Sequence, residues 1–173
     1  MRVSRSFIPA LLVAAAPMFA AGGSTPVVGA PSVSAAATAS AKIYQPIAIK
    51  KTADLNFGAM IATPNAGKVV LDAAGVRTAS GGAVLASAAG VSAAAFQVDG
   101  EPNTSYSLAL PASISITSSG NSMTVDSFVA DANTTLLDSK GTQAFNVGAT
   151  LGVGANQAAG LYTGSFSVTV AYN

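Results

Sequence analysis

Short runs in which apolar and polar residues alternate recur along the chain, and this pattern constrains the fold more than any other feature. Successive side chains of an extended strand point to opposite faces, so a period of two indicates strands with one buried face. The runs lie about ten residues or more apart, which is typical of a β-sandwich or barrel. Their apolar members are Val69 and Leu71; Ala94, Phe96 and Val98; Tyr106, Leu108 and Leu110; Met123 and Val125; Phe145, Val147, Ala149, Leu151 and Val153; and Phe166, Val168, Val170 and Tyr172.

Turn-forming residues separate these runs. Gly, Pro, Asn and Asp favour tight turns because they tolerate or preset the backbone angles that turns require. The pattern therefore predicts an all-β, immunoglobulin-like antiparallel β-sandwich with little or no helix, and at most one helical turn within residues 82–95. The stretches expected to turn are residues 64–67, 72–75, 99–103, 118–121, 138–141 and 152–160.

The first twenty residues have the composition of a secretory signal peptide. Arg2 and Arg5 give a positive start, residues 7–19 are mainly apolar, and small residues suited to cleavage occur up to Ala20. A membrane anchor is the alternative, but the apolar run is short and contains two prolines. We therefore expect residues 1–20 to be a signal peptide and the protein to be exported.

Two further regions follow this segment. Residues 21–38 are uncharged and rich in Ser, Ala, Pro and Val, which predicts a flexible N-terminal extension. Residues 39–173 are expected to form the β-sandwich domain. Its first strand is expected from residue 39, with Pro46 at an edge or bulge, because the odd positions are apolar: Ala39, Ala41, Ile43, Ile47 and Ile49.

A second membrane segment is also considered, because residues 78–98 are uncharged and long enough to cross a bilayer. Their Gly, Ser and Ala content makes insertion into lipid weakly favourable at best. We expect no membrane span in the mature chain.

The composition argues against enzymatic and nucleic-acid functions. The chain has neither Cys nor His, so the commonest metal ligands, the usual general base and the thiol nucleophile are missing. Loss of the signal peptide removes two of eight basic residues and leaves six against seven acidic ones, a net charge of about −1. We expect no catalytic site, no metal, no cofactor and no nucleic-acid partner.

The end of the chain has the strongest functional signal. Residues 141–173 contain no charged side chain, and the last strand alternates Gly164, Phe166, Val168, Val170 and Tyr172 with small polar residues. An exposed edge of this kind would promote aggregation, so the strand must pair within its own sheet or with a partner. Both alternatives are open at this point.

This end of the chain resembles that of chaperone–usher pilin subunits. Those subunits end in an alternating apolar strand with Tyr second from the C-terminus and Gly fourteenth, the places that Tyr172 and Gly160 hold here. The resemblance implies a pilin-like sandwich that lacks one strand. A periplasmic chaperone lends that strand during export, and the N-terminal extension of the next subunit replaces it in the fibre by strand addition.

The resemblance also implies roles for particular residues. Gly160 would mark the turn before a pairing strand lined by Phe166, Val168, Val170 and Tyr172. The partners would be identical or related subunits, a periplasmic chaperone and an outer-membrane usher, and the location would extend from the periplasm to a fimbrium on the cell surface. The candidate donor strand presents Val33, Ala35, Ala37, Ala39 and Ala41.

A second resemblance covers residues 41–173. Segments 54–58, 96–100, 147–151 and 159–164 are similar to DUF4402, a bacterial family of exported, pilin-like proteins without an established activity. We expect a structural subunit of a pilus-like fibre assembled by donor-strand pairing. The alternative is a self-complete secreted β-sandwich that acts as a surface binding or adhesion module.

Overall fold

Antiparallel strands account for all the regular secondary structure in the computed structural model, which describes residue 29 and residues 31–132 and 134–173. The expected signal peptide, residues 1–20, and the first part of the extension lie outside the described residues. The strands are β1 (Ala48–Ala53), β2 (Met60–Leu71), β3 (Arg77–Leu85), β4 (Ala94–Asp99), β5 (Tyr106–Ala109), β6 (Ser113–Ser118), β7 (Asn121–Ala130), β8 (Thr142–Val153) and β9 (Thr169–Tyr172).

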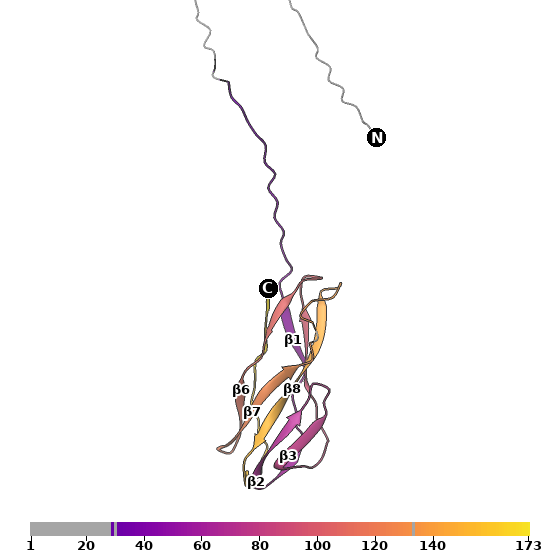
Figure 1. Cartoon of the computed structure of the whole chain (residues 1–173), viewed down its shortest axis with the longest axis vertical. Coiled ribbons are helices and arrows are strands. Elements are labelled where there is room, and N and C mark those ends of the chain that lie inside the picture. The colour runs from indigo at the N-terminus through magenta and orange to yellow at the C-terminus, as the bar shows by residue number, and fades with distance from the viewer. Residues whose placement is uncertain (1–28, 30, 133) are drawn as a thin grey trace, which may run out of the picture. The chain divides into compact units, whose positions relative to one another are not determined.

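The main sheet is built around β8. On one edge, β8 pairs first with β4, through residues 142–147, and then with β2, through residues 149–153. On its other edge it pairs with β7, which in turn pairs with β6. β1 extends the sheet beyond β4, and β3 extends it beyond β2. Figure 1 shows β1 near the C-terminus and β2 and β3 toward the other end of the domain.

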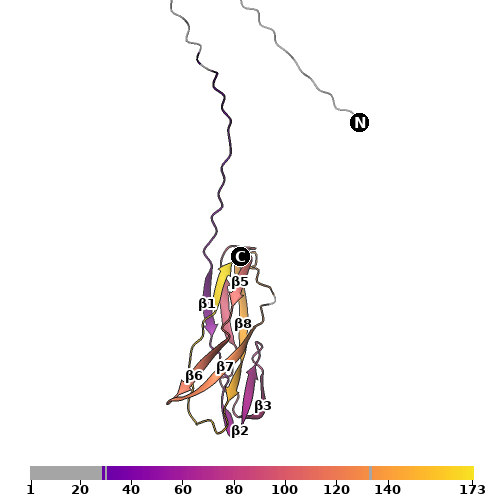
Figure 2. The same cartoon turned by 60° about the vertical axis from the view of Figure 1, so that its left-hand side comes forward.

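The second sheet is smaller and consists of β5 and β9. An isolated bridge between Ser105 and Leu136 adds one more segment beside β5. β6 directly follows β5 in the chain but belongs to the main sheet, so the chain changes sheets at residues 110–112. Figure 2 shows β9 in yellow beside β5 and close to β1.

The core consists of two clusters, and β8 supplies residues to both; only the second also includes residues of β5 and β9. Phe145, Val147, Ala149, Leu151 and Val153 alternate along this strand and are all buried. One cluster gathers around Val69, Leu71, Val125 and Leu151, and a second gathers around Phe96, Val98, Tyr106 and Val147. Within the described residues no buried polar or charged side chain accompanies them, so apolar burial holds the sheets together.

The predicted all-β sandwich is confirmed, but several local predictions are wrong. The first strand begins at Ala48 rather than at residue 39, because residues 41–46 are exposed and have no neighbouring strand. β3 and β6 were not expected, and residues 82–95 contain no helix. Within the described residues no helix is long and apolar enough to cross a membrane.

The predicted turn at residues 64–67 is a bulge inside β2. The register with β3 shifts between the pair Ala62–Ala83 and the pair Gly67–Gly81, so four residues of β2 lie opposite one residue of β3. A side chain at Gly82 would collide with the carbonyl oxygen of Asn65, at 1.9 Å from its Cβ. The small residue at position 82 therefore makes room for this bulge.

Candidate functional site

An open apolar groove of about 950 Å³ lies along the C-terminal segment. Residues 53–60, which join β1 to β2, form one wall, and residues 160–166 form the other. The floor consists of core side chains from the main sheet. These floor residues are Phe96, Ile114, Ile116, Met123, Val125, Leu151 and Val153.

The C-terminal wall is attached to β6 along one of its edges. Thr163 and Thr117 exchange two backbone hydrogen bonds, 2.9 and 3.0 Å long. Two glycines permit this close approach: a Cβ at Gly160 would lie 2.4 Å from the Ser118 hydroxyl oxygen, and one at Gly164 would lie 2.8 Å from the Ser115 carbonyl oxygen. A larger residue at Gly164 would push the wall away from β6, whereas at Gly160 the Ser118 side chain would have to rotate.

The other edge of this wall faces the groove. Thr163 bonds β6, and residues 164–168 after it have no strand assignment, while Gly164 and Phe166 line the groove. Among the described residues, the backbone groups of Gly164, Phe166 and Val168 form no hydrogen bond. The groove therefore combines an apolar floor with a wall whose backbone groups are free to bond among the described residues.

The opposite wall is held by Arg77. Its guanidinium donates hydrogen bonds to the carbonyl oxygens of Phe57, Ala59 and Ser87, at 2.7, 3.0 and 3.0 Å. The Asn56 side chain accepts a hydrogen bond from the Gly58 N–H at 2.8 Å, and Gly58 has a φ of +69°. These contacts fix the loop between β1 and β2 beside the groove.

The predicted pairing-strand residues lie on one face of the C-terminal segment. Phe166, Val168, Val170 and Tyr172 are half-buried and pack on the core, while the odd-numbered residues between them are exposed. The Phe166 ring lies 4.9 Å from that of Phe128 and 6.2 Å from that of Phe96, measured between centroids. Gly160 lies at a bend where this segment begins.

Regular strand structure in this segment is shorter than the sequence predicted, since β9 begins only at Thr169. β9 pairs with β5 through one edge, from Tyr106–Tyr172 to Ala109–Thr169. Between Thr163 and Thr169 the segment passes the point where the chain changes sheets. Pro111, at that point, has no N–H to donate.

The predicted donor residues are not part of any strand in the structure. Residues 31–46 have no regular secondary structure and are exposed throughout. The Val33 side chain is 96% exposed. The pairing of Val33, Ala35, Ala37, Ala39 and Ala41 with a neighbouring chain stays a prediction.

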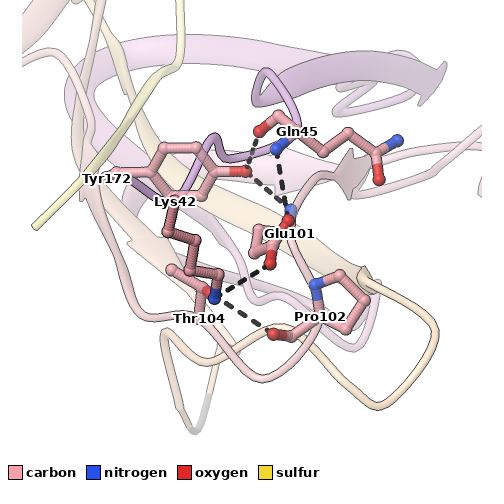
Figure 3. A network of polar contacts seen from close by, with 6 residues as sticks. All are labelled: Lys42, Gln45, Glu101, Pro102, Thr104 and Tyr172. Carbon is pink, nitrogen blue, oxygen red and sulfur yellow. Dashed lines mark hydrogen bonds and ion pairs between the residues drawn. The ribbon is translucent and has the colours of Figure 1, made fainter. Parts of the chain in front are cut away.

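A polar network links the start of the domain to its end, and we call its members Lys42, Gln45, Glu101 and Tyr172 the latch (Figure 3). The Tyr172 hydroxyl accepts a hydrogen bond from the Glu101 N–H at 2.6 Å and donates one to the Gln45 carbonyl at 2.7 Å. The Gln45 N–H donates to the Glu101 carboxylate at 3.2 Å, and Lys42 pairs with the same carboxylate at 3.1 Å.

Electrostatics in the latch favour the charged carboxylate. The Gln45 N–H and the Lys42 ammonium hold the pKa of Glu101 below its ordinary value of 4.5. The aromatic face of Tyr44 adds to this group, because Lys42 Nζ lies 4.5 Å from the centroid of that ring. The Glu101 carboxylate is therefore charged at neutral pH.

Several residues of these sites could not be found by reading the sequence for chemistry. Arg77 is an isolated basic residue, and nothing near it in sequence indicates the carbonyl groups that it bonds. Gly100 lies in a predicted turn, yet its role is steric: a Cβ there would lie 2.4 Å from the Tyr172 hydroxyl oxygen. Ile114 and Ile116 alternate and were a usable signal for β6.

The described residues contain no group of three His, Cys, Asp or Glu side chains that could hold a metal ion. A family model described as a domain of unknown function, DUF4402, matches residues 47–172. Neither the curated proteins nor the solved structures include a significant match to the chain. The matched region contains both walls of the groove and all nine strands of the described residues.

Proposed function

The chain belongs to the DUF4402 family, whose function is unknown, and from its open groove we propose that it is a structural subunit of a pilus-like extracellular fibre. In this proposal the groove of one subunit accepts a donor strand from the next. The protein is exported through the periplasm and acts at the cell surface. A periplasmic chaperone would cover the groove before assembly, and an outer-membrane usher would deliver the subunit.

The observation that carries the proposal is the wall with free backbone groups above an apolar floor. Gly164 and Phe166 line the groove, and their backbone groups form no hydrogen bond among the described residues. Core side chains such as Val125 and Leu151 lie beneath them. A strand inserted here would satisfy the backbone groups and cover the floor. A small ligand would instead need hydrogen-bond donors and acceptors at the regular spacing of a peptide backbone.

The extension has the pattern that such a strand needs. From Val33 to Ala41 every odd position is apolar, while Ser34, Thr38 and Ser40 occupy even positions. Nine extended residues span about 30 Å, which exceeds the roughly 23 Å of the seven-residue wall at 160–166. The extension is exposed and outside every strand, so it is free to pair with another copy.

Backbone hydrogen bonds would supply much of the affinity. Alanine side chains bury little apolar area, and a buried CH₂ group contributes only about 0.8 kcal/mol. Each new hydrogen bond to the C-terminal wall adds about 0.5–1.5 kcal/mol. An uncharged donor with small side chains can therefore occupy the groove through its peptide groups, with Val33 as its largest apolar contact.

The test is to interrupt the donor face in the exported full-length chain. We expect Ala37→Asp to abolish polymers seen by size-exclusion chromatography and electron microscopy, because it would bury a charge in the groove. Thr38→Asp, on the opposite face of the same strand, is the matched control and should polymerise. A parent protein that stays strictly monomeric, even with its own secretion partners, would overturn the proposal.

The rival function is a self-complete sandwich that acts as a surface binding or adhesion module. It predicts that the groove needs no strand. A chain lacking residues 22–40 would then fold with unchanged stability and bind its target as a monomer. The fibre proposal predicts instead that this truncated chain accepts a synthetic peptide of residues 31–43 and gains thermal stability from it.

A further inference from the structure

The latch joins two regions that donor-strand pairing would use in different ways. Lys42 and Gln45 directly follow the proposed donor residues in the chain. Tyr172 belongs to β9, which continues the wall of the groove. Glu101 lies in the loop after β4 and contacts Lys42, Gln45 and Tyr172. Residues 42–45, which directly follow the extension, are therefore bonded to the end of the C-terminal segment.

The latch and the groove lie at different points along these segments. Tyr172 is six residues beyond Phe166, the last groove residue of its segment, or about 20 Å along an extended chain. Gln45 is likewise six residues before Lys51, where the groove lining begins on the other side. The chain therefore passes through the latch before it reaches its own groove.

For the extension to fill the groove of its own subunit, the chain would have to reverse direction near the latch. A strand placed between β1 and the C-terminal segment would form a hairpin with β1, and its turn would fall between residues 41 and 48. Residues 41–47 contain no turn or bend in the structure. Both the N–H and the C=O of Gln45 are bonded within the latch, and a turn that used these groups would have to break those hydrogen bonds.

We infer that the latch keeps the extension out of its own groove and so reserves it for a second copy of the chain. This inference rests on the proposed function. In this inference, Tyr172 and Glu101 influence whether the extension fills the groove of its own subunit or pairs with another copy in a fibre. The latch residues do not line the groove, so weakening the latch should leave the groove able to accept a strand.

The absence of cysteine from the sequence allows a direct test. Thr38→Cys in the extension and Ser165→Cys on the groove wall place single thiols on outward faces, and Ser34→Cys with Ser165→Cys covers a second register. A flexible bis-maleimide then links whichever thiols are close. Links within one chain give monomers at every protein concentration, whereas links between chains give dimers and larger products on a denaturing gel.

In the otherwise unaltered chain we expect products linked between chains. Tyr172→Phe removes both hydrogen bonds of this hydroxyl, and Glu101→Gln removes the ion pair with Lys42. Each should raise the ratio of internally linked monomer to linked polymer by about five-fold or more, because the loss of a single hydrogen bond already has about that effect. Ser107→Ala is the control, because it removes a 3.2 Å hydrogen bond to the Ala171 carbonyl in β9 without touching the extension. It should leave the ratio unchanged.

The outcomes separate the two ideas. If links form but their partition is the same in the parent and in Tyr172→Phe, the latch does not choose between copies, and the inference is wrong while strand exchange stands. If the parent forms mainly internally linked monomers, the inference is also wrong. If neither cysteine pair gives any link, the groove does not take the extension, and the proposed function fails first.

Discussion

Thr163 and Thr117 exchange both of their backbone hydrogen bonds, and this pair attaches the C-terminal segment to β6. Thr163 bonds β6, whereas the backbone groups of Gly164 and Phe166, which line the groove, form no hydrogen bond among the described residues. The pair can form only because the segment comes very close to β6.

Replacing Gly164 by Ala should weaken the attachment of this wall. The new Cβ would lie 2.8 Å from both the Ser115 carbonyl oxygen and the Ile116 side chain, and the backbone atom cannot move aside. We expect a loss of about 1–3 kcal/mol in the free energy of unfolding, measured by urea denaturation. Gly152→Ala, whose Cβ would meet its nearest atom at 3.6 Å, should cost far less. Equal stability losses in both variants would contradict the steric argument.

Arg77→Met should loosen the opposite wall. The substitution removes hydrogen bonds to the carbonyl groups of Phe57, Ala59 and Ser87, so we expect a loss of about 1–3 kcal/mol in stability and faster amide exchange in residues 56–60. Lys68→Met removes an exposed charge of the same sign that makes no hydrogen bond or ion pair among the described residues. It should have little effect on either measurement.

Tyr106 should ionise late in an alkaline titration. Burial raises the pKa of Tyr106 above its ordinary value of 10.0, so its neutral form contributes stability that is complete below that pH. This contribution is lost as the pH rises through the higher folded-state pKa. Absorbance at tyrosinate wavelengths should show a late step in the folded protein. Tyr106→Phe should remove the step and cost about 1 kcal/mol, because the hydroxyl donates a 2.9 Å hydrogen bond to Gln143. A titration unchanged by this substitution would contradict the assignment.

Acid should open the latch only at low pH. The pKa of Glu101 is lowered in the folded state, so its stabilising contribution is present above the ordinary value of 4.5 and is lost as the pH falls through the lower folded-state value. The cross-linking ratio should therefore stay constant as the pH falls from 7 to the ordinary value of 4.5 and change only at lower pH. A chain carrying Glu101→Gln should show no such change, and a transition well above pH 5 would exclude Glu101 as its cause.

Alternation predicted the fold where one face of a strand is fully buried. Val69, Phe96, Val125 and Phe145 all lie in the core, as their runs indicated, because a strand with one wet face has to alternate. β3 was not predicted, because it is an edge strand in which Gly81 and Gly82 interrupt the alternation of apolar and polar residues. Residues 39–47 also alternate, but they have no neighbouring strand. Because a strand is defined by its pairing, the strand expected from residue 39 is absent there.

The groove itself could be anticipated only in part. The uncharged C-terminal segment indicated a strand in need of a partner, and Phe166 to Tyr172 do face the core. The opposite wall depends on Arg77 contacts across 10 to 20 residues of chain, and the latch depends on a hydroxyl meeting a carbonyl 127 residues away. Such contacts follow from the completed sandwich and leave no local pattern.

The position of β8 in the chain determines when the domain can fold. This strand is bonded to β2, β4 and β7, yet it comes from residues 142–153, close to the C-terminus. Strands β2, β4 and β7 precede β8 in the sequence, so each lacks this neighbour until residues 142–153 are available. Pairings between such distant residues form slowly, and the waiting chain exposes unpaired edges that invite aggregation.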